Sequence, residues 1–233
     1  MQSDDSSSSA IAFYDRLVAE TEAERSTFMA LPIIRKALAG GLSKEVYLSY
    51  LSEAFHHVRH TVPLMALVND RLGAEHSAFR IGLADYAVQK RGQERWILHD
   101  IDLTGGDADA VRNGVPSSAT QALVDFAYDY VAQVNPMAIF GMIFVIERTG
   151  SGLAERAVEH FMETLGLPRK CFSYLLSHGF ADFAEKDFLE GLMAQVNGPA
   201  EQDAIIHMAQ RMYDLYGQVF QAIADKAGVD DTV

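Results

Sequence analysis

The segment YLSYLSEAFHHVRHTVPLMALVNDR, residues 47–71, places a glutamate and three histidines within eight residues of largely apolar sequence. Because an α-helix turns about 100° per residue, positions four and seven apart lie on one side of it. Glu53, His57 and His60 have this spacing, and His56 lies beside them. A helix that is apolar on most sides is usually buried, and a buried carboxylate without a partner is costly. The segment therefore predicts a buried helix whose polar groups need partners, and a cation would satisfy them.

The remaining sequence also favours helices. No run alternates polar and apolar residues over the length of a strand, so we expect an all-α fold of about eight helices. Ser43 and Ser117 or Ser118 are suitable N-caps, and Pro63 predicts a kink. Apolar spacing with Gly and Pro breaks predicts further helices over 10–29, 33–38, 74–91, 93–103, 118–134, 136–165, 169–195 and 201–227, with a loop over 104–116. We expect one domain over 10–228, between a disordered tail at 1–9 and a C-terminal tail at 229–233.

Composition limits the classes of function. The chain has 233 residues, 49% of them hydrophobic, and a formal net charge of -13. No basic patch is visible, which argues against nucleic-acid binding. The single cysteine, Cys171, excludes an intramolecular disulfide and suits a reducing compartment. The N-terminus lacks a signal-peptide pattern, and the longest apolar run, 137–146, is too short to span a bilayer. We therefore expect a soluble cytoplasmic protein with no membrane partner.

Two further polar features resemble the first one in spacing or setting. His178, Asp182 and Glu185 are again separated by four and seven positions, and Glu147 follows an apolar run. Helical bundles that hold two metal ions use carboxylates and imidazoles that project inward from facing helices. The three features together favour a metal site between helices. Each also has a structural explanation, because a buried histidine is more often hydrogen-bonded, and Glu147 could belong to an interhelical salt bridge.

Three segments resemble the superfamily of TenA and the pyrroloquinoline quinone biosynthesis protein C (PqqC), which has a heme-oxygenase-like fold. They read LPIIRKALAGGLSKEVYLSYLSEAFHHV at 31–58, ERWILHDIDLTGGD at 94–107 and GLPRKCFSYLLSHGFADFAEKDFLEGL at 166–192. The last segment is most similar to the diiron oxidase branch, which includes the chlamydial protein associating with death domains. That branch carries Glu-x6-His, a later Glu, and His-x3-Asp-x2-His.

The resemblance implies a nonheme oxidase or oxygenase that uses O2 on a small organic substrate. It implies metal ligands at Glu53, His60, Glu147, His178 and Asp182, with Glu185 at the position of the final family histidine. The metal would be two iron ions, or iron and manganese, with no heme or nucleotide. His56 and His57 could orient the ligands. Catalytic residues are not assigned, and a homodimer is plausible. The pocket lining that we predict is Phe55, Tyr86, Met137, Phe140, Phe144 and Tyr174.

Three alternatives compete with this prediction. The sequence argues against thiaminase activity, because the resemblance places the nucleophilic cysteine of that branch at Met137 and one of its tyrosines at Gly141. A metal-free, PqqC-like oxidase would need several arginines around an anionic substrate, and only Arg59 and Arg148 are near. The third alternative is a binding protein whose metal site has degenerated, and Glu185 in place of the family histidine would be the first sign of that loss. His76, His99, His160 and His207 lack an acidic partner at useful spacing, and we interpret them as surface or core residues.

Overall fold

The computed structural model describes residues 13–150, 153–179 and 184–229, and all regular structure within these ranges is helical. The prediction of an all-α bundle is confirmed. Residues 13–20 are helical, and short 3-10 turns cover Ala74–His76, Pro136–Ala138 and Arg169–Phe172. The α-helices that follow in the described ranges are α2 (Glu22–Met29), α3 (Pro32–Leu38), α4 (Lys44–Val58), α5 (Thr61–Arg71), α6 (Ser77–Lys90), α7 (Gln93–Thr104), α8 (Ala108–Asn113), α9 (Ser118–Gln133), α10 (Ile139–Gly150), α11 (Leu153–Leu165), α12 (Ser173–Gly179), α13 (Ala184–Met193) and α14 (Pro199–Ala227).

The described chain divides into more and shorter helices than the eight predicted. The predicted loop at 104–116 contains α8, whose first turn is capped by the side chain of Asp107. The predicted tail at 1–9 lies outside the described residues, as does all but the first residue of the tail at 229–233. Within the described residues, no helix is long and apolar enough to cross a membrane.

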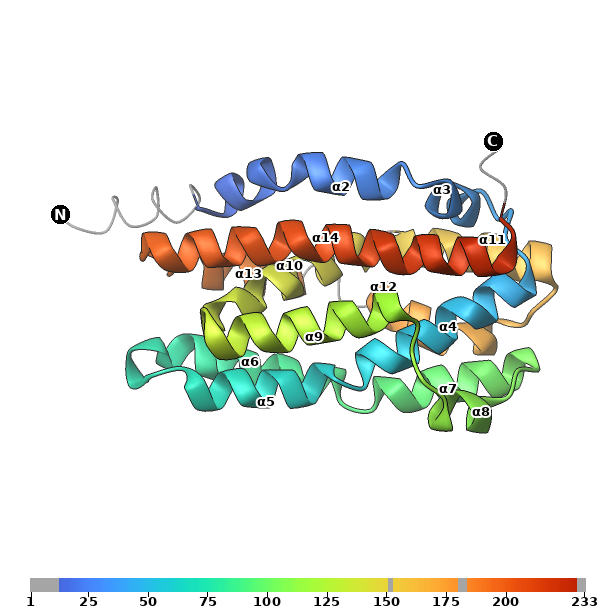
Figure 1. Ribbon diagram of the computed structural model, residues 1–233, viewed down its shortest axis with the longest axis horizontal. Coiled ribbons are helices and arrows are strands. Elements are labelled where there is room, and N and C mark those ends of the chain that lie inside the picture. Colours follow the sequence, from blue (N-terminus) through green and yellow to red (C-terminus); the bar gives the residue numbers. More distant parts are fainter. Residues whose placement is uncertain (1–12, 151–152, 180–183, 230–233) are drawn as a thin grey trace.

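Helix α14 organises the bundle. It is 29 residues long, about 43 Å at 1.5 Å per residue, and it contacts α2, α4, α9 and α10. In Figure 1 it runs across the molecule with α2 along one side and α9 along the other. Its contact with α10 is close, because a Cβ atom added at Gly141 would lie 2.1 Å from the carbonyl oxygen of Ile205. These contacts fix α4 and α10, which carry Glu53 and Glu147, on the same central helix.

The helix predicted over the segment 47–71 is broken before its proline. Helix α4 ends at Val58, and α5 begins at Thr61 after a two-residue turn. Pro63 therefore occupies the first turn of α5, where a missing N–H costs no intrahelical hydrogen bond. His60 lies in the turn, so Glu53 and His57 share helix α4 but His60 does not. The predicted cap is confirmed, because the Ser43 hydroxyl accepts from the Val46 N–H at 3.3 Å.

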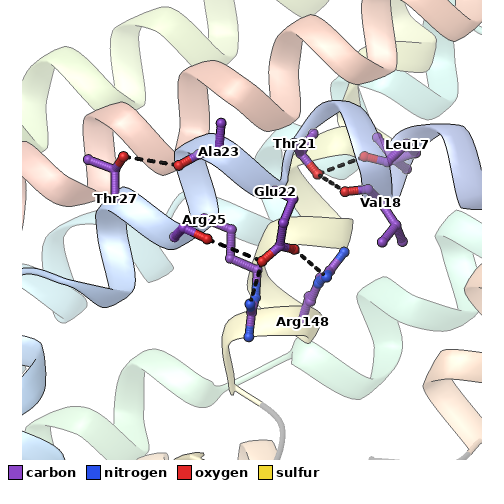
Figure 2. Close-up of polar contacts among 9 residues, drawn as sticks. Leu17, Val18, Thr21, Glu22, Ala23, Arg25, Thr27 and Arg148 are labelled. Carbon is purple, nitrogen blue, oxygen red and sulfur yellow. Dashed lines mark hydrogen bonds and ion pairs between the residues drawn. The ribbon is translucent and has the colours of Figure 1, made fainter.

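An interhelical ion pair fastens α2 to α10 (Figure 2). Arg148 donates from Nη2 to Oε2 of Glu22 at 2.8 Å, while Arg25 donates to the other oxygen of Glu22 at 3.1 Å. The guanidinium of Arg148 also lies 5.5 Å from the centre of the Phe144 ring. Arg148 is thus engaged with α2. The same helix carries Phe28, which forms part of the wall of the cavity described next.

Candidate functional site

An apolar cavity of about 200 Å³ lies between α4, α14 and the short helix α3. Most of its lining is aliphatic or aromatic. The lining residues on α4 that carry a polar group are Tyr47, Tyr50, Glu53 and His57, and α14 adds Tyr216. Glu53 and His57 were predicted site residues, and both reach this cavity. It is the natural candidate for a binding site, because ligand sites are concave, mainly apolar and carry a few convergent polar groups.

Glu53 is held at the start of helix α9. Its Oε2 accepts hydrogen bonds from the backbone N–H of Ser117 at 3.1 Å, from the Ser117 hydroxyl at 3.0 Å and from the Thr120 hydroxyl at 2.5 Å. A carboxylate is favourable there because the N-terminus of a helix carries partial positive charge. Oε1 accepts no hydrogen bond from the described residues, so one oxygen of Glu53 remains available to a ligand or a metal ion.

The three histidines of the first motif point in different directions. His57 makes an edge contact with the Tyr216 ring, their centroids 5.4 Å apart. The Nδ1 of His60 lies 3.4 Å from the Tyr128 hydroxyl on α9, whereas His56 is buried against Phe55. Burial lowers the pKa of both His56 and His60, and Arg59 adds to this effect. Both rings are therefore neutral near pH 7, the form in which imidazole binds metal.

Glu147 is not the isolated carboxylate that the sequence suggests. Lys90 on α6 places Nζ 3.0 Å from its Oε1, and the Tyr86 hydroxyl donates to the same oxygen. The ammonium of Lys90 also lies 4.6 Å from the centre of the Tyr86 ring. The structural alternative of an interhelical salt bridge therefore describes Glu147 here, with Lys90 as the partner. Nothing in the spacing of the sequence indicated Lys90.

A buried aspartate supports the part of the site that comes from α12. Asp100 on α7 is fully buried, and its Oδ2 accepts from the backbone N–H of Tyr174 at 2.8 Å. Burial raises the pKa of Asp100. Tyr174 lines the cavity, and its hydroxyl is hydrogen-bonded to that of Tyr50. Burial raises the pKa of both tyrosines, so both stay neutral at physiological pH.

The second predicted ligand motif cannot be placed. Asp182 lies outside the described residues, and so do the side chains of His178 and Glu185, although α12 and α13 include their backbones. Among the described residues no group of three or more His, Cys, Asp or Glu side chains could hold a metal ion. Glu53 and His60 both face α9, whereas Glu147 faces α6. The metal roles of all six residues stay predictions.

Donor chemistry on the α4 side fits a metal ion. In the described part of the chain, the Oε1 of Glu53 and the Nε2 of His60 have no hydrogen-bond partner, so both atoms could bind a metal ion. A metal-binding imidazole usually has its other nitrogen hydrogen-bonded to a fixed group, and Tyr128 stands in that position for His60.

The predicted pocket lining is only partly matched. Tyr174 lines the cavity, whereas Phe55, Tyr86, Met137, Phe140 and Phe144 are buried in the core and are not among its lining residues. Sequence reasoning missed Tyr50 and Tyr216. Tyr50 lies three residues before Glu53, on the same side of the helix, which is a signal that could have found it. Tyr216 has no such signal, because it depends on the packing of α14 against α4.

Comparison with solved structures defines the class of protein as heme-oxygenase-like. A domain of unknown function from Shewanella denitrificans, described as having a heme oxygenase-like fold, superposes with a TM-score of 0.79 at 20% identity, covering 94% of this chain and 97% of that one. A TenA homologue from Pseudomonas syringae gives 0.77 at 12% identity, covering 92% and 93%. Heme oxygenase-1 from the cyanobacterium Synechocystis, in complex with heme, gives 0.69 at 16% identity, covering 93% and 96%. These identities show a shared fold.

The chain belongs to the family of iron-containing redox enzymes, whose model matches residues 48–217. This range includes Glu53, His60 and Glu147, together with the whole second motif. The resemblance to the TenA and PqqC superfamily is confirmed at the level of fold and family. No curated protein matches the chain.

Proposed function

We propose that this chain is a nonheme oxidase that binds two iron ions, or iron and manganese, and uses O2 to oxidise a small, mainly apolar organic substrate. The observation that carries the proposal is the polar end of the cavity. The chain belongs to an iron-containing redox family. Glu53 lines that end of the cavity, and one of its carboxylate oxygens has no hydrogen-bond donor among the described residues. Glu53, His60, Glu147, His178, Asp182 and Glu185 would hold the metal. When bound, iron would provide the redox chemistry that reduces O2.

The chain's own residues would place the substrate and keep water away. Tyr50 and Tyr174 have neutral hydroxyls bonded to each other, and the edge of His57 rests on Tyr216. These groups can donate to or accept from a polar end of a substrate. The aliphatic lining beyond them excludes water from the remaining length. Ser117 and Thr120 fix the orientation of Glu53 through its other oxygen.

Three other functions receive less support. A PqqC-like oxidase would need arginines at the site, but Arg148 is paired with Glu22, and no lysine or arginine belongs to the described lining. A heme enzyme would need more space, since sites for drug-sized ligands typically measure roughly 300–1,000 Å³. A binding protein on a degenerate site is the second candidate, and the ion pair between Lys90 and Glu147 favours it.

Metal analysis tests the proposal. After anaerobic reconstitution with ferrous iron and desalting, we expect about two irons per chain, as in other dimetal carboxylate bundles. Glu53→Ala, His60→Ala and His178→Ala should each lose iron. His207→Ala is the control and should keep its iron, because this histidine is exposed and lies outside the predicted ligand set. A wild-type protein that retains no iron would overturn the oxidase and leave the binding protein as the better function.

A further inference from the structure

The cavity follows one face of each of two long helices. Its lining residues on α4 run from Val46 to His57, and those on α14 run from Tyr213 to Ile223. At 1.5 Å per residue each stretch covers roughly 15 Å. The ring of His57 contacts Tyr216, while Tyr50 stacks on Phe220 with centroids 5.8 Å apart. Because higher numbers on α4 meet lower numbers on α14, the helices are antiparallel here. A volume of about 200 Å³ along such a length describes a narrow cavity.

Polarity changes along this length in the same direction on both helices. The end formed by the last turns of α4 has Glu53 and His57, and α14 adds Tyr216 to it. At the other end α4 contributes Val46 and Tyr47, and α14 contributes Ile223. The Tyr47 hydroxyl is already engaged, because it donates to the carbonyl oxygen of Cys171 at 2.8 Å. Helix α3 and the residues after it close that end with aliphatic side chains, Ile34, Leu38 and Leu42 among them. The cavity therefore has a hydrogen-bonding end and an apolar end.

The charge at the polar end is negative. Glu53 is the single acidic residue in the described lining, which contains no lysine or arginine. An anionic group placed there would meet a carboxylate with no basic side chain to offset the repulsion. A hydrogen-bond donor, in contrast, would find the carboxylate of Glu53 and the hydroxyl oxygens of the tyrosines.

We propose that the cavity binds a single-chain amphiphile of medium length, with its apolar chain toward α3 and a hydrogen-donating, non-anionic head group, an alcohol or a primary amine, beside Glu53. About 200 Å³ holds somewhat more than benzene, which fills an engineered cavity of about 150 Å³, so the occupant has roughly ten non-hydrogen atoms. As a substrate class this assignment rests on the proposed oxidase; as a binding site it does not need the metal.

Calorimetric titration of the metal-free protein tests the head group. Decanol, decylamine and decanoate are compared below their aggregation concentrations, and one molecule of decanol or decylamine should bind per chain. Decanoate should bind at least about tenfold more weakly. In Glu53→Gln the difference between decylamine and decanoate should shrink, because the repelling charge is gone. Decanoate binding as tightly as both other compounds to the wild type would overturn the assignment.

A chain-length series and a matched pair of variants test the apolar end. From hexanol to decanol the affinity should rise by up to about fourfold per methylene, the value for a fully buried CH₂. Ala37→Phe fills the lining at α3 and should weaken decanol binding, whereas Ala39→Phe, at an exposed position of the same segment, should not. Equal binding by both variants would overturn the orientation of the chain.

Failure of the oxidase and failure of this site are separate results. Amphiphile binding by a protein that takes up no iron removes the substrate role and keeps the binding site. Iron uptake without amphiphile binding removes the binding site and keeps the oxidase.

Discussion

The Nζ of Lys90 lies 3.0 Å from the Oε1 of Glu147, with the side chains only 4% and 14% exposed. A buried pair of this kind contributes little net stability, but removing one partner leaves an uncompensated charge. We therefore expect Lys90→Met to destabilise the metal-free protein by about 3 kcal/mol. Urea unfolding measures the change. The double variant Lys90→Met/Glu147→Leu should recover most of the loss, and a single variant as stable as the wild type would contradict this account.

The same lysine should compete with the metal under the proposed function. With Lys90 in place, an iron ion that binds Glu147 must displace or repel an ammonium group 3.0 Å away. Lys90→Met should therefore bind ferrous iron at least about tenfold more tightly than the wild type. Lys90→Arg is the control that keeps the charge. Anaerobic competition with a colorimetric chelator gives the affinities, and equal affinities in the methionine and arginine variants would remove Glu147 from the ligand set.

Asp100 provides a test that depends on pH. Because burial raises its folded-state pKa above the unfolded value, the folded protein binds more protons than the unfolded one between the two values. The contribution of Asp100 to stability is therefore most favourable below about pH 4, the ordinary aspartate range, and falls as pH rises through the folded-state pKa.

Asp100→Asn keeps an oxygen that can accept from the Tyr174 N–H and removes the buried charge. Relative to the wild type, this variant should become more stable as pH rises from 4 to 8, as measured by thermal unfolding across that range. Asp100→Ala loses the acceptor as well and should be less stable than Asp100→Asn by about 1–3 kcal/mol at every pH. A constant difference between the asparagine variant and the wild type would contradict the raised pKa.

The all-α architecture and several helix ends were predictable because they depend on local signals. Ser43 and Ser117 are N-caps, and apolar spacing gave α7 and α9 nearly to the residue. Such signals act within one or two turns. They also located Glu53 and His57 on one helix face, which is why both reach the same cavity.

Partners from distant segments were not predictable. Lys90 is 57 positions from Glu147 in the sequence, and only the packing of α6 against α10 brings them together. His76 has no acidic partner at helical spacing in the sequence, yet its Nε2 lies 2.7 Å from Glu201 at the start of α14. That partner also comes from a distant segment. The break between α4 and α5 was misplaced because the sequence suggests a kink at Pro63, whereas the structure accommodates the proline in a new first turn.

Gly141 gives a last prediction, and it concerns both packing and function. A Cβ there would lie 2.1 Å from the Ile205 carbonyl oxygen and 3.0 Å from the Ala209 nitrogen, so α10 would have to move off α14. Gly141→Ala should therefore destabilise the protein by about 2 kcal/mol, despite the better helix propensity of alanine. Gly191→Ala, in α13 with no atom of the described residues within 4 Å of the added Cβ, should be neutral or stabilising by up to about 1 kcal/mol.

Chemical denaturation of both glycine variants separates the effect of packing from that of helix propensity, and similar stabilities would contradict the close contact.

The close contact at Gly141 also bears on the thiaminase alternative. The resemblance would put one of that branch's tyrosines at Gly141, where the backbone of α14 leaves no room even for a methyl group. Met137 already replaces the nucleophilic cysteine in the same part of the chain. Two positions on consecutive turns thus differ from the thiaminase branch, Met137 in its chemistry and Gly141 in the space for a side chain.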